Sequence, residues 1–340
     1  MEHLAIDLGG MESQICVRSS DGKMLLEERR PTAQLKALLR RRPKSRVVLE
    51  TCAEAFAVAD AALELGHEVR VVPATLVHSL GVGARGIKTD RRDAQVLSEV
   101  SCRIDLPSVH VPSMEARRRK SLCGMREGLV SARTQLINTV RGWLRTELRR
   151  IGTGGTESFP LRVRKHFTEK SATTMPRFVE RQLEAIESLN EQIAEADQEL
   201  AELAKTDNTC VRLMTVPGVG PVTAIRFVAA LDEVSRFAGA HQVESYLGLT
   251  PGENSSSSRQ RRTGMTKAGS PMLRRALGQA AWSLRRCRRV DPLQQWANEV
   301  EKRRGRYIAT SALMRKLAGI LYAIWRDGST YDPKRSAMPQ

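Results

Sequence analysis

The sequence predicts an α/β domain followed by two segments that are mainly helical. Short apolar runs alternate with a helical pattern over the first hundred residues, whereas apolar residues recur every three or four positions beyond Pro112. A length of 340 residues fits two or three domains. We therefore divide the chain into an α/β domain (1–110), a basic helix with a coiled-coil segment (111–207) and a mainly helical C-terminal domain (208–340).

Five strands and one helix are expected in the first domain. The strands cover residues 4–8, 13–18, 23–28, 47–50 and 68–72, and the helix covers 53–65 before Gly66. The second and third strands flank the turn signal Asp21-Gly22. A three-stranded meander followed by strand, helix and strand is compatible with an RNase H-like fold.

A basic amphipathic helix is expected over residues 117–150. Its apolar stripe consists of Leu122, Met125, Leu129, Ala132, Leu136, Val140 and Trp143. The same span holds ten basic and two acidic side chains, a net charge of +8. A solvated helix face is the alternative, but this much charge favours contact with phosphates. The candidate contacts are Arg117, Arg118, Arg119, Lys120, Arg126, Arg133 and Arg141.

A second long helix is expected after Pro176, beyond a Gly, Thr and Ser-rich connector at 151–175. The helix has four heptads, with Val179, Ile186, Ile193 and Leu200 at one position and Gln182, Leu189, Ala196 and Leu203 at the other. It pairs either with the basic helix in an antiparallel hairpin or with a second chain. The sequence leaves both arrangements open.

The C-terminal domain contains a glycine-rich turn and a second basic region. Residues 215–221, TVPGVGP, match the turn of a helix-hairpin-helix, in which Gly218 and Gly220 would let backbone N–H groups approach a phosphate. A turn that joins two core helices fits equally well. A polar loop at 252–269 and a helical region up to Trp325 follow, and residues 259–306 hold fourteen basic and three acidic side chains. The candidate contacts there are Arg259, Arg261, Arg262, Lys267, Arg274 and Arg275.

The composition points to a polyanionic partner. The chain has 55 Lys and Arg against 38 Asp and Glu, a net charge of +17. Its longest apolar stretch, 317–325, has nine residues, which excludes a membrane-spanning helix, and the first residues lack a secretory signal, so a cytoplasmic, nucleoid-associated protein is expected. Six cysteines without a CxxC pair argue against a zinc site or disulfides and predict buried, reduced thiols.

Four carboxylates could form one site. Asp7 and Glu50 each end a predicted strand, and Asp90 and Asp93 lie three residues apart on a predicted helix. Each acid alone is more often a cap or an ion-pair partner. As an ordered set on an RNase H-like sheet, they have the oxygen ligands that Mg²⁺ prefers and the arrangement that phosphoryl-transfer sites use.

A run of serines at 255–258 is the second candidate. Such a run is usually a flexible linker. Here it lies between Pro251 and four basic residues, so a hydroxyl there would sit in a positive field that favours attack on a phosphate. From spacing alone, the linker interpretation is favoured.

Together these motifs carry a family resemblance. The chain resembles a DEDD transposase of insertion sequence family 110, in its subgroup 1111, from about residue 4 to residue 290. The segments AIDLGG, VVLET and KTDRRDA match the acids of that family in order, and TVPGVGPVTA, YLGLTPGENSSSS and TGMTKAGSPMLRRAL match its C-terminal domain. The resemblance implies a RuvC-like N-terminal domain, a coiled coil and a transposase domain.

The resemblance also implies a mechanism. Asp7, Glu50, Asp90 and Asp93 would hold Mg²⁺, and Ser256 would attack a DNA phosphate to form a covalent intermediate. Counting from Pro251 and from Lys267 gives Ser256 in both directions, although Ser257 stands where the family has glycine, and Ser255 is the alternative. The partners implied are a structured noncoding guide (bridge) RNA, double-stranded target and donor DNA, and further copies of the chain in a dimer or tetramer.

Three rival functions remain open. A RuvC-like nuclease would use the same acids to activate water. A sugar-kinase or actin-like ATPase also begins with an Asp-Leu-Gly-Gly loop, but the later Gly-rich nucleotide loops are missing. A structural RNA-binding protein would need the charge and not the acids.

Overall fold

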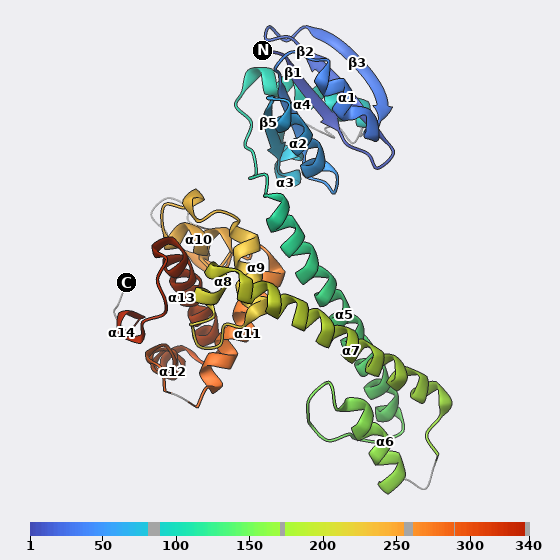
Figure 1. The fold of residues 1–340 in the computed structure, drawn as a ribbon, viewed down its shortest axis with the longest axis vertical. Helices are drawn as coiled ribbons and strands as arrows, with labels where there is room; N and C mark the ends of the chain where they lie inside the picture. The colour runs from blue at the N-terminus through green and yellow to red at the C-terminus, as the bar shows by residue number, and fades with distance from the viewer. Residues whose placement is uncertain (81–88, 171–173, 255–260, 289, 337–340) are drawn as a thin grey trace. The chain divides into compact units, whose positions relative to one another are not determined.

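The computed structural model forms two compact units, residues 1–112 and residues 113–340 (Figure 1). It describes the chain except for residues 81–88, 171–173, 255–260, 289 and 337–340. The predicted α/β domain corresponds to the first unit. The basic helix and the C-terminal domain both belong to the second unit.

The first unit is built on a five-stranded mixed sheet with the order β3-β2-β1-β4-β5. The strands are β1 (His3–Asp7), β2 (Glu12–Arg18), β3 (Met24–Pro31), β4 (Arg46–Glu50) and β5 (Glu68–Val72). The first three are antiparallel neighbours, whereas β1, β4 and β5 run parallel. The five predicted strands and the meander are confirmed, and the topology is compatible with an RNase H-like domain.

Helices cover both faces of this sheet (Figure 1). They are η1 (Thr32–Gln34), α1 (Leu35–Arg40), α2 (Ala55–Glu64), α3 (Ala74–Val77), η2 (His78–Leu80) and α4 (Asp90–Arg103). Leu4 and Ile6 pack in one core with α1 and α2. The intervening Ala5 packs in another core with Leu97 of α4. Side chains alternate between the faces of a strand, so odd-numbered residues of β1 face α4.

The second unit contains a long antiparallel helical hairpin, α5 (Met114–Thr146) and α7 (Arg177–Thr206) (Figure 1). One core cluster holds Ile137 and Val140 of α5 together with Val179 and Ile186 of α7. Of the two pairings that the sequence left open, the described chain therefore makes the one within a single chain. This pairing covers the apolar heptad face of α7.

The buried face of α5 differs from the predicted stripe. Met125 is 72% exposed and Ala132 is also exposed, whereas Arg133 is buried. Arg133 enters the seam because its guanidinium donates a hydrogen bond to Asn190 at 2.9 Å and lies 3.3 Å from a carboxylate oxygen of Glu157. On α7, Leu183 is buried in place of the predicted Gln182.

The expected connector at 151–175 contains a helix, α6 (Phe159–Lys170), and this expectation was wrong. Phe159, Val163 and Phe167 are spaced four residues apart and are buried against α5 and α7. Residues at this spacing share one face of a helix. The Gly and Thr content of the flanking residues hid this apolar face.

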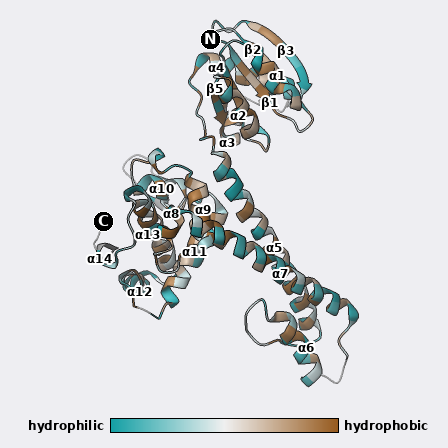
Figure 2. Cartoon of the chain, viewed as in Figure 1, coloured by the Kyte–Doolittle hydropathy of each residue, from teal (hydrophilic) through white to brown (hydrophobic). Residues whose placement is uncertain are grey.

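The rest of the second unit is a helical domain with a small hairpin of strands. Its elements are α8 (Asn208–Leu213), α9 (Pro221–Leu231), η4 (Val234–Arg236), α10 (Ala240–Tyr246), β6 (Pro251–Glu253), β7 (Arg262–Met265), α11 (Pro271–Arg286), α12 (Pro292–Arg304), α13 (Arg306–Asp327) and α14 (Pro333–Ser336). Helix α9 is largely hydrophobic (Figure 2) and most of it is buried. Its Phe227 shares a core with Leu277 of α11 and Tyr322 of α13.

Two expectations from composition can be compared with the structure. Among the described helices, none is long and apolar enough to cross a membrane. The prediction that the cysteines are buried holds for Cys16, Cys123 and Cys210, whereas Cys52 and Cys287 are exposed.

Gly218 allows two helices to pack closely. Its φ is +85°, and a Cβ there would lie 2.4 Å from the carbonyl oxygen of Ala280 and 2.9 Å from the backbone nitrogen of Leu284, both on α11. Gly220, the N-cap of α9, has a φ of −100° and no such neighbour within 4 Å. The geometry therefore supports a turn between core helices at Gly218.

We expect Gly218→Ala to lower the free energy of unfolding by about 2–4 kcal/mol, because it adds left-handed strain and overlaps α11. Gly220→Ala is the matched control and should cost less than about 1 kcal/mol. Urea unfolding followed by circular dichroism measures both. Equal losses of stability from the two substitutions would contradict the packing role of Gly218. A loss of DNA binding without a loss of stability would instead indicate that the turn binds phosphate.

His3 should make the stability depend on pH. Its Nδ1 lies 2.8 Å from Oγ of Ser101 on α4, and burial, followed by the charge of Arg46, lowers the pKa of His3 below 6.5. The unfolded chain then binds this proton more tightly, so stability should decrease as the pH falls below about 6.5. Urea midpoints at pH 7.5 and 5.5 measure the loss. His3→Gln should reduce it, and an unchanged loss would exclude His3 as its source.

Candidate active site

The strand ends place Asp7 and Glu50 side by side. Strands β1 and β4 are parallel with Ile6 opposite Leu49, so Asp7 and Glu50 follow as neighbours at the same edge. Ala5 and Val48, two residues earlier on each strand, both belong to the core beneath α4. Because alternate residues share a face, both carboxylates project on the α4 side of the sheet.

Helix α4 brings Asp93 to the same edge. Its buried stripe consists of Ser101, Leu97 and Asp93, at intervals of four residues. Ser101 contacts His3 and Leu97 shares a core with Ala5, so α4 runs antiparallel to β1. Four helical residues rise about 6 Å and two strand residues about 6.6 Å, so the next pair along this register is Asp93 with Asp7.

The N-terminus of α4 is fixed by caps and by an ion pair. The Thr89 side chain accepts a hydrogen bond from the backbone N–H of Arg92, which places Asp90 and Asp93 in the first turn, where the helix dipole favours carboxylates. Arg91 donates to Glu27 of β3 at 2.9 Å and lowers the pKa of that carboxyl. Arg91 therefore holds α4 against the sheet. Asp90 is exposed and Asp93 is 3% exposed.

The loop after Asp7 is tightly closed. A Cβ on Gly9 would lie 2.3 Å from the carbonyl oxygen of Glu12, and the carbonyl oxygen of Gly9 accepts a hydrogen bond from Thr32 at 2.6 Å. A Cβ on Gly10 would lie 3.9 Å from Oε1 of Glu54. Glu54 is not among the predicted site residues, although its place four residues after Glu50 is a signal for a further acid near this edge.

The donor chemistry at this edge fits a hard divalent cation, since all four predicted ligands offer carboxylate oxygens. Within the described residues, however, no three acidic, histidine or cysteine side chains lie close enough to hold one metal ion. Asp7, Glu50 and Asp93 thus share an edge of the sheet without converging on a preformed metal centre.

The predicted nucleophile falls in the sequence between β6 and β7 of the second unit, and this pair of strands is called the serine hairpin here. Ser256, its alternative Ser255 and the basic Arg259 lie outside the described residues. In the described residues around them, β6 and β7 pair in antiparallel fashion, and the backbone N–H of Asn254 donates to the carbonyl of Arg261 at 2.9 Å. A backbone hydrogen bond therefore joins Asn254 to Arg261, the described residues on either side of this segment.

The two sequence motifs that flank this hairpin pack against each other. The backbone N–H of Lys267 donates to the carbonyl of Gly248 at 3.0 Å. A Cβ on Gly248 would lie 2.4 Å from the backbone nitrogen of Ala268, and one on Gly269 would lie 2.3 Å from the carbonyl oxygen of Tyr246. The glycines of GLTP and TKAG are therefore required for this close contact.

The structure separates the predicted phosphate contacts into paired and exposed groups. Arg119 lies 2.7 Å from a carboxylate oxygen of Asp207, Arg126 donates twice to Asp197, and Arg133 is buried as described above. In the C-terminal region, Arg274 donates to the carbonyl oxygens of Leu247 and Gly269. These four guanidinium groups have structural partners within the chain.

The remaining described candidates supply surface charge. Arg118, Lys120, Arg141, Arg261 and Lys267 are exposed, and Arg117 is partly exposed. Arg275 is also exposed, and it pairs with Glu127 of α5. Arg141 lies over the ring of Phe159, with 5.3 Å between the guanidinium carbon and the ring centroid. The helix α5 thus offers fewer basic groups to a partner than its composition indicates.

Two family models match the sequence. A model described as "Transposase" matches residues 4–147, and one described as "Transposase IS116/IS110/IS902 family" matches residues 210–296. The first covers nearly all of the sheet and helix α4, with the four acids, and the second covers the serine hairpin.

Curated relatives match almost the whole chain. It is similar to the "Transposase for insertion sequence element IS1111A" of Coxiella burnetii, at 29% identity over 96% of this chain and 90% of the relative. It is also similar to a "Probable family 20 transposase" of Pseudomonas aeruginosa, at 29% identity over 88% and 90%. A third relative, the "Transposase for insertion sequence element IS1328" of Yersinia enterocolitica, is 27% identical over 96% and 98%. The chain is thus similar over most of its length to transposases of the IS116/IS110/IS902 type, and these matches identify it as a DNA transposase.

Proposed function

We propose that this transposase is guided by a structured RNA and recombines DNA through a serine-linked intermediate. The observation that carries the proposal is the register of α4 on β1, which brings Asp93 to the edge formed by Asp7 and Glu50. A cluster of acids at a sheet edge suits phosphoryl transfer, and the serine hairpin supplies a nucleophile that a water-dependent nuclease would not need.

The acids Asp7, Glu50, Asp90 and Asp93 are the proposed ligands of Mg²⁺. Magnesium often binds proteins through one or two carboxylates and takes its other ligands from water and substrate phosphate. A pair such as Asp7 and Glu50 is therefore a sufficient start, and the scissile phosphate would complete the site. When bound, the ion would neutralise charge that develops on the phosphate oxygens.

Replacing Asp7, Glu50 or Asp93 by its amide should reduce DNA cleavage at least about a hundredfold, because each change removes a charged oxygen ligand. The double variants should be no worse than the single ones, because the acids act as a unit. Cleavage of a supercoiled plasmid that carries the recognised DNA ends measures this. EDTA should stop the reaction and Mg²⁺ should restore it.

Asp105→Asn is the matched control. Asp105 is an acid of the same unit whose side chain is 73% exposed and pairs with Arg46 and Arg70, away from the strand ends that carry Asp7 and Glu50. This variant should cleave at the wild-type rate. Persistent cleavage in EDTA, or in the Asp93→Asn protein, would show that the acids are structural.

Ser256 is the proposed nucleophile. Its Oγ would bond to phosphorus as the bond from phosphorus to one sugar oxygen breaks, which leaves a free sugar hydroxyl and a phosphate ester on the serine. The new phosphodiester on the serine can be attacked by a sugar hydroxyl to rejoin the strands. Attack by water would leave a phosphate monoester, which cannot be rejoined in this way. Exposed Arg261 and Lys267 flank the hairpin and add positive charge for this step.

End-labelled DNA should migrate as a protein–DNA adduct on a denaturing gel after reaction with the wild type. Ser256→Ala should abolish the adduct, and Ser255→Ala, the matched control one residue away, should retain it. An adduct that disappears only with Ser255→Ala would move the nucleophile by one residue. Free cleaved strands without an adduct from any of the proteins would identify a nuclease instead.

In this proposal, the positive surface charge binds the phosphates of the nucleic acids. The net charge of +17 and the exposed basic groups of α5 and of the C-terminal region suit a structured guide RNA together with double-stranded target and donor DNA. The acids and the serine belong to different compact units, so a dimer or tetramer, in which one chain supplies the acids and another the serine, is part of the proposal.

A further inference from the structure

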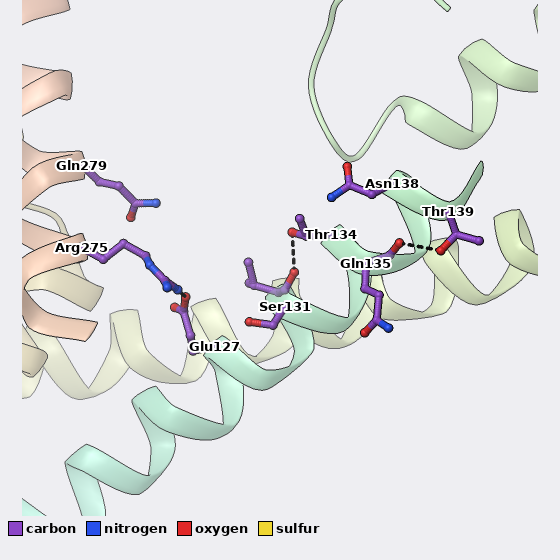
Figure 3. A pocket seen from close by; sticks show the side chains of 9 residues that line it. Glu127, Ser131, Thr134, Gln135, Asn138, Thr139, Arg275 and Gln279 are labelled. Atoms are coloured by element: carbon purple, nitrogen blue, oxygen red, sulfur yellow. Dashed lines mark hydrogen bonds and ion pairs between the residues drawn. The ribbon is translucent and has the colours of Figure 1, made fainter. Parts of the chain in front are cut away.

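A polar groove lies between α5 and α11 in the second unit. One cavity of about 790 Å³ is lined by Glu127, Val130, Ser131, Thr134, Gln135, Asn138, Thr139, Arg275 and Gln279. A second cavity of about 600 Å³ is lined by Gln279, Trp282, Ser283, Arg286 and Cys287. Gln279 borders both cavities. Figure 3 shows Arg275 and Gln279 extending from α11 toward the polar row on α5.

The charged side chains that line this groove favour the binding of an anion. Glu127 is the one acidic side chain among the described lining residues. It accepts a hydrogen bond from the buried Arg226 at 2.8 Å and pairs with Arg275. Burial opposes ionisation of Glu127, but these two arginines outweigh it and lower its pKa. The carboxylate is thus neutralised, and Arg275, whose side chain is 58% exposed, is held at the groove.

Beyond Glu127, the polar residues that α5 contributes to this cavity are uncharged and can form hydrogen bonds. Thr134 donates its hydroxyl to the carbonyl of Val130 at 2.8 Å, and Thr139 donates to that of Gln135 at 3.0 Å (Figure 3). Their oxygens remain available as acceptors. The amides of Gln135 and Asn138 both donate and accept. Such a wall suits the sugars and base edges of a nucleic acid.

Trp282 gives the second cavity an aromatic face surrounded by arginines. The guanidinium carbons of Arg306, Arg285 and Arg286 lie 4.5, 5.1 and 5.9 Å from the centroid of its ring. Arg285 is held by Glu301 and by a hydrogen bond to Thr310 at 3.0 Å. Arg286 is exposed and lines the cavity. An indole close to cationic groups is a combination on which unpaired bases stack.

We propose that this groove binds a single strand of nucleic acid, with one unpaired base on Trp282 and phosphates on Arg275 and Arg286. The inference rests on the nucleic-acid function proposed above and adds a defined site to it. Arg275, Gln279, Trp282 and Arg286 follow one another at intervals of four, three and four residues, so they share a face of α11. From Arg275 to Arg286 the helix rises about 16 Å, the length of up to about five stacked nucleotides.

The decisive variant is Gln279→Glu. It keeps the size of an exposed side chain and introduces a negative charge where the two cavities meet. Fluorescence anisotropy of the full chain with a labelled eight-nucleotide strand should show affinity reduced at least about tenfold. Gln295→Glu, the same change at an exposed position of α12, is the matched control and should bind as the wild type does.

A second pair of variants tests stacking. Trp282→Ala should weaken binding by about tenfold or more, and Trp282→Phe should restore most of it, because phenylalanine keeps an aromatic face. Phe178→Ala is the control, since Phe178 is an aromatic residue that is 56% exposed on α7 and does not line the groove. Circular dichroism confirms that each variant is folded.

The same binding assay compares an RNA strand and a DNA strand of one sequence, and it compares each strand with its duplex. Tighter RNA binding would identify a segment of guide RNA as the occupant, and tighter DNA binding a displaced DNA strand. Duplex binding that matches or exceeds single-strand binding, or Gln279→Glu binding as tightly as Gln295→Glu, would overturn the proposal. The assay involves no cleavage, so failure here would leave the recombination proposal intact.

Discussion

The register between one helix and one strand determines the acidic edge of this protein. Side chains on α4 repeat every four residues, about 6 Å, and side chains on one face of β1 repeat every two, about 6.6 Å. Because these two repeats are nearly equal, Ser101 contacts His3 and Leu97 packs in one core with Ala5. The same register places Asp93 next to Asp7 along the strand. A shift of one residue in β1 would turn Asp7 toward the opposite face.

The sequence predicted much of the first unit because its signals are local. Apolar runs and the Asp21-Gly22 turn were enough to locate five strands, and strand parity puts Asp7 and Glu50 on one face once their neighbours are known to be buried. The docking of α4 was not predictable from the sequence. It depends on contacts such as His3 with Ser101, which are 98 residues apart.

In the second unit, the number of basic residues in a helix overestimates how many of them are available to bind phosphate. Basic residues on α5 suggest a uniform phosphate-binding face, yet Arg126 and Arg133 use their hydrogen bonds on Asp197 and Asn190 of α7. A buried guanidinium needs such partners, because leaving it without them would be costly. The same constraint displaced the apolar stripe of α5, and the role of Gly218 likewise depends on α11, far along the chain.

The two halves of the proposed chemistry are organised independently. The acids depend on the sheet and α4, and the serine hairpin depends on the contact between GLTP and TKAG, which Gly248 and Gly269 allow. The contacts named here for each part lie within one unit. In the proposed reaction both parts must reach one phosphate. The step that brings them together is therefore the step that nucleic acid can control, because correct pairing of RNA with DNA would position the phosphate that both parts require.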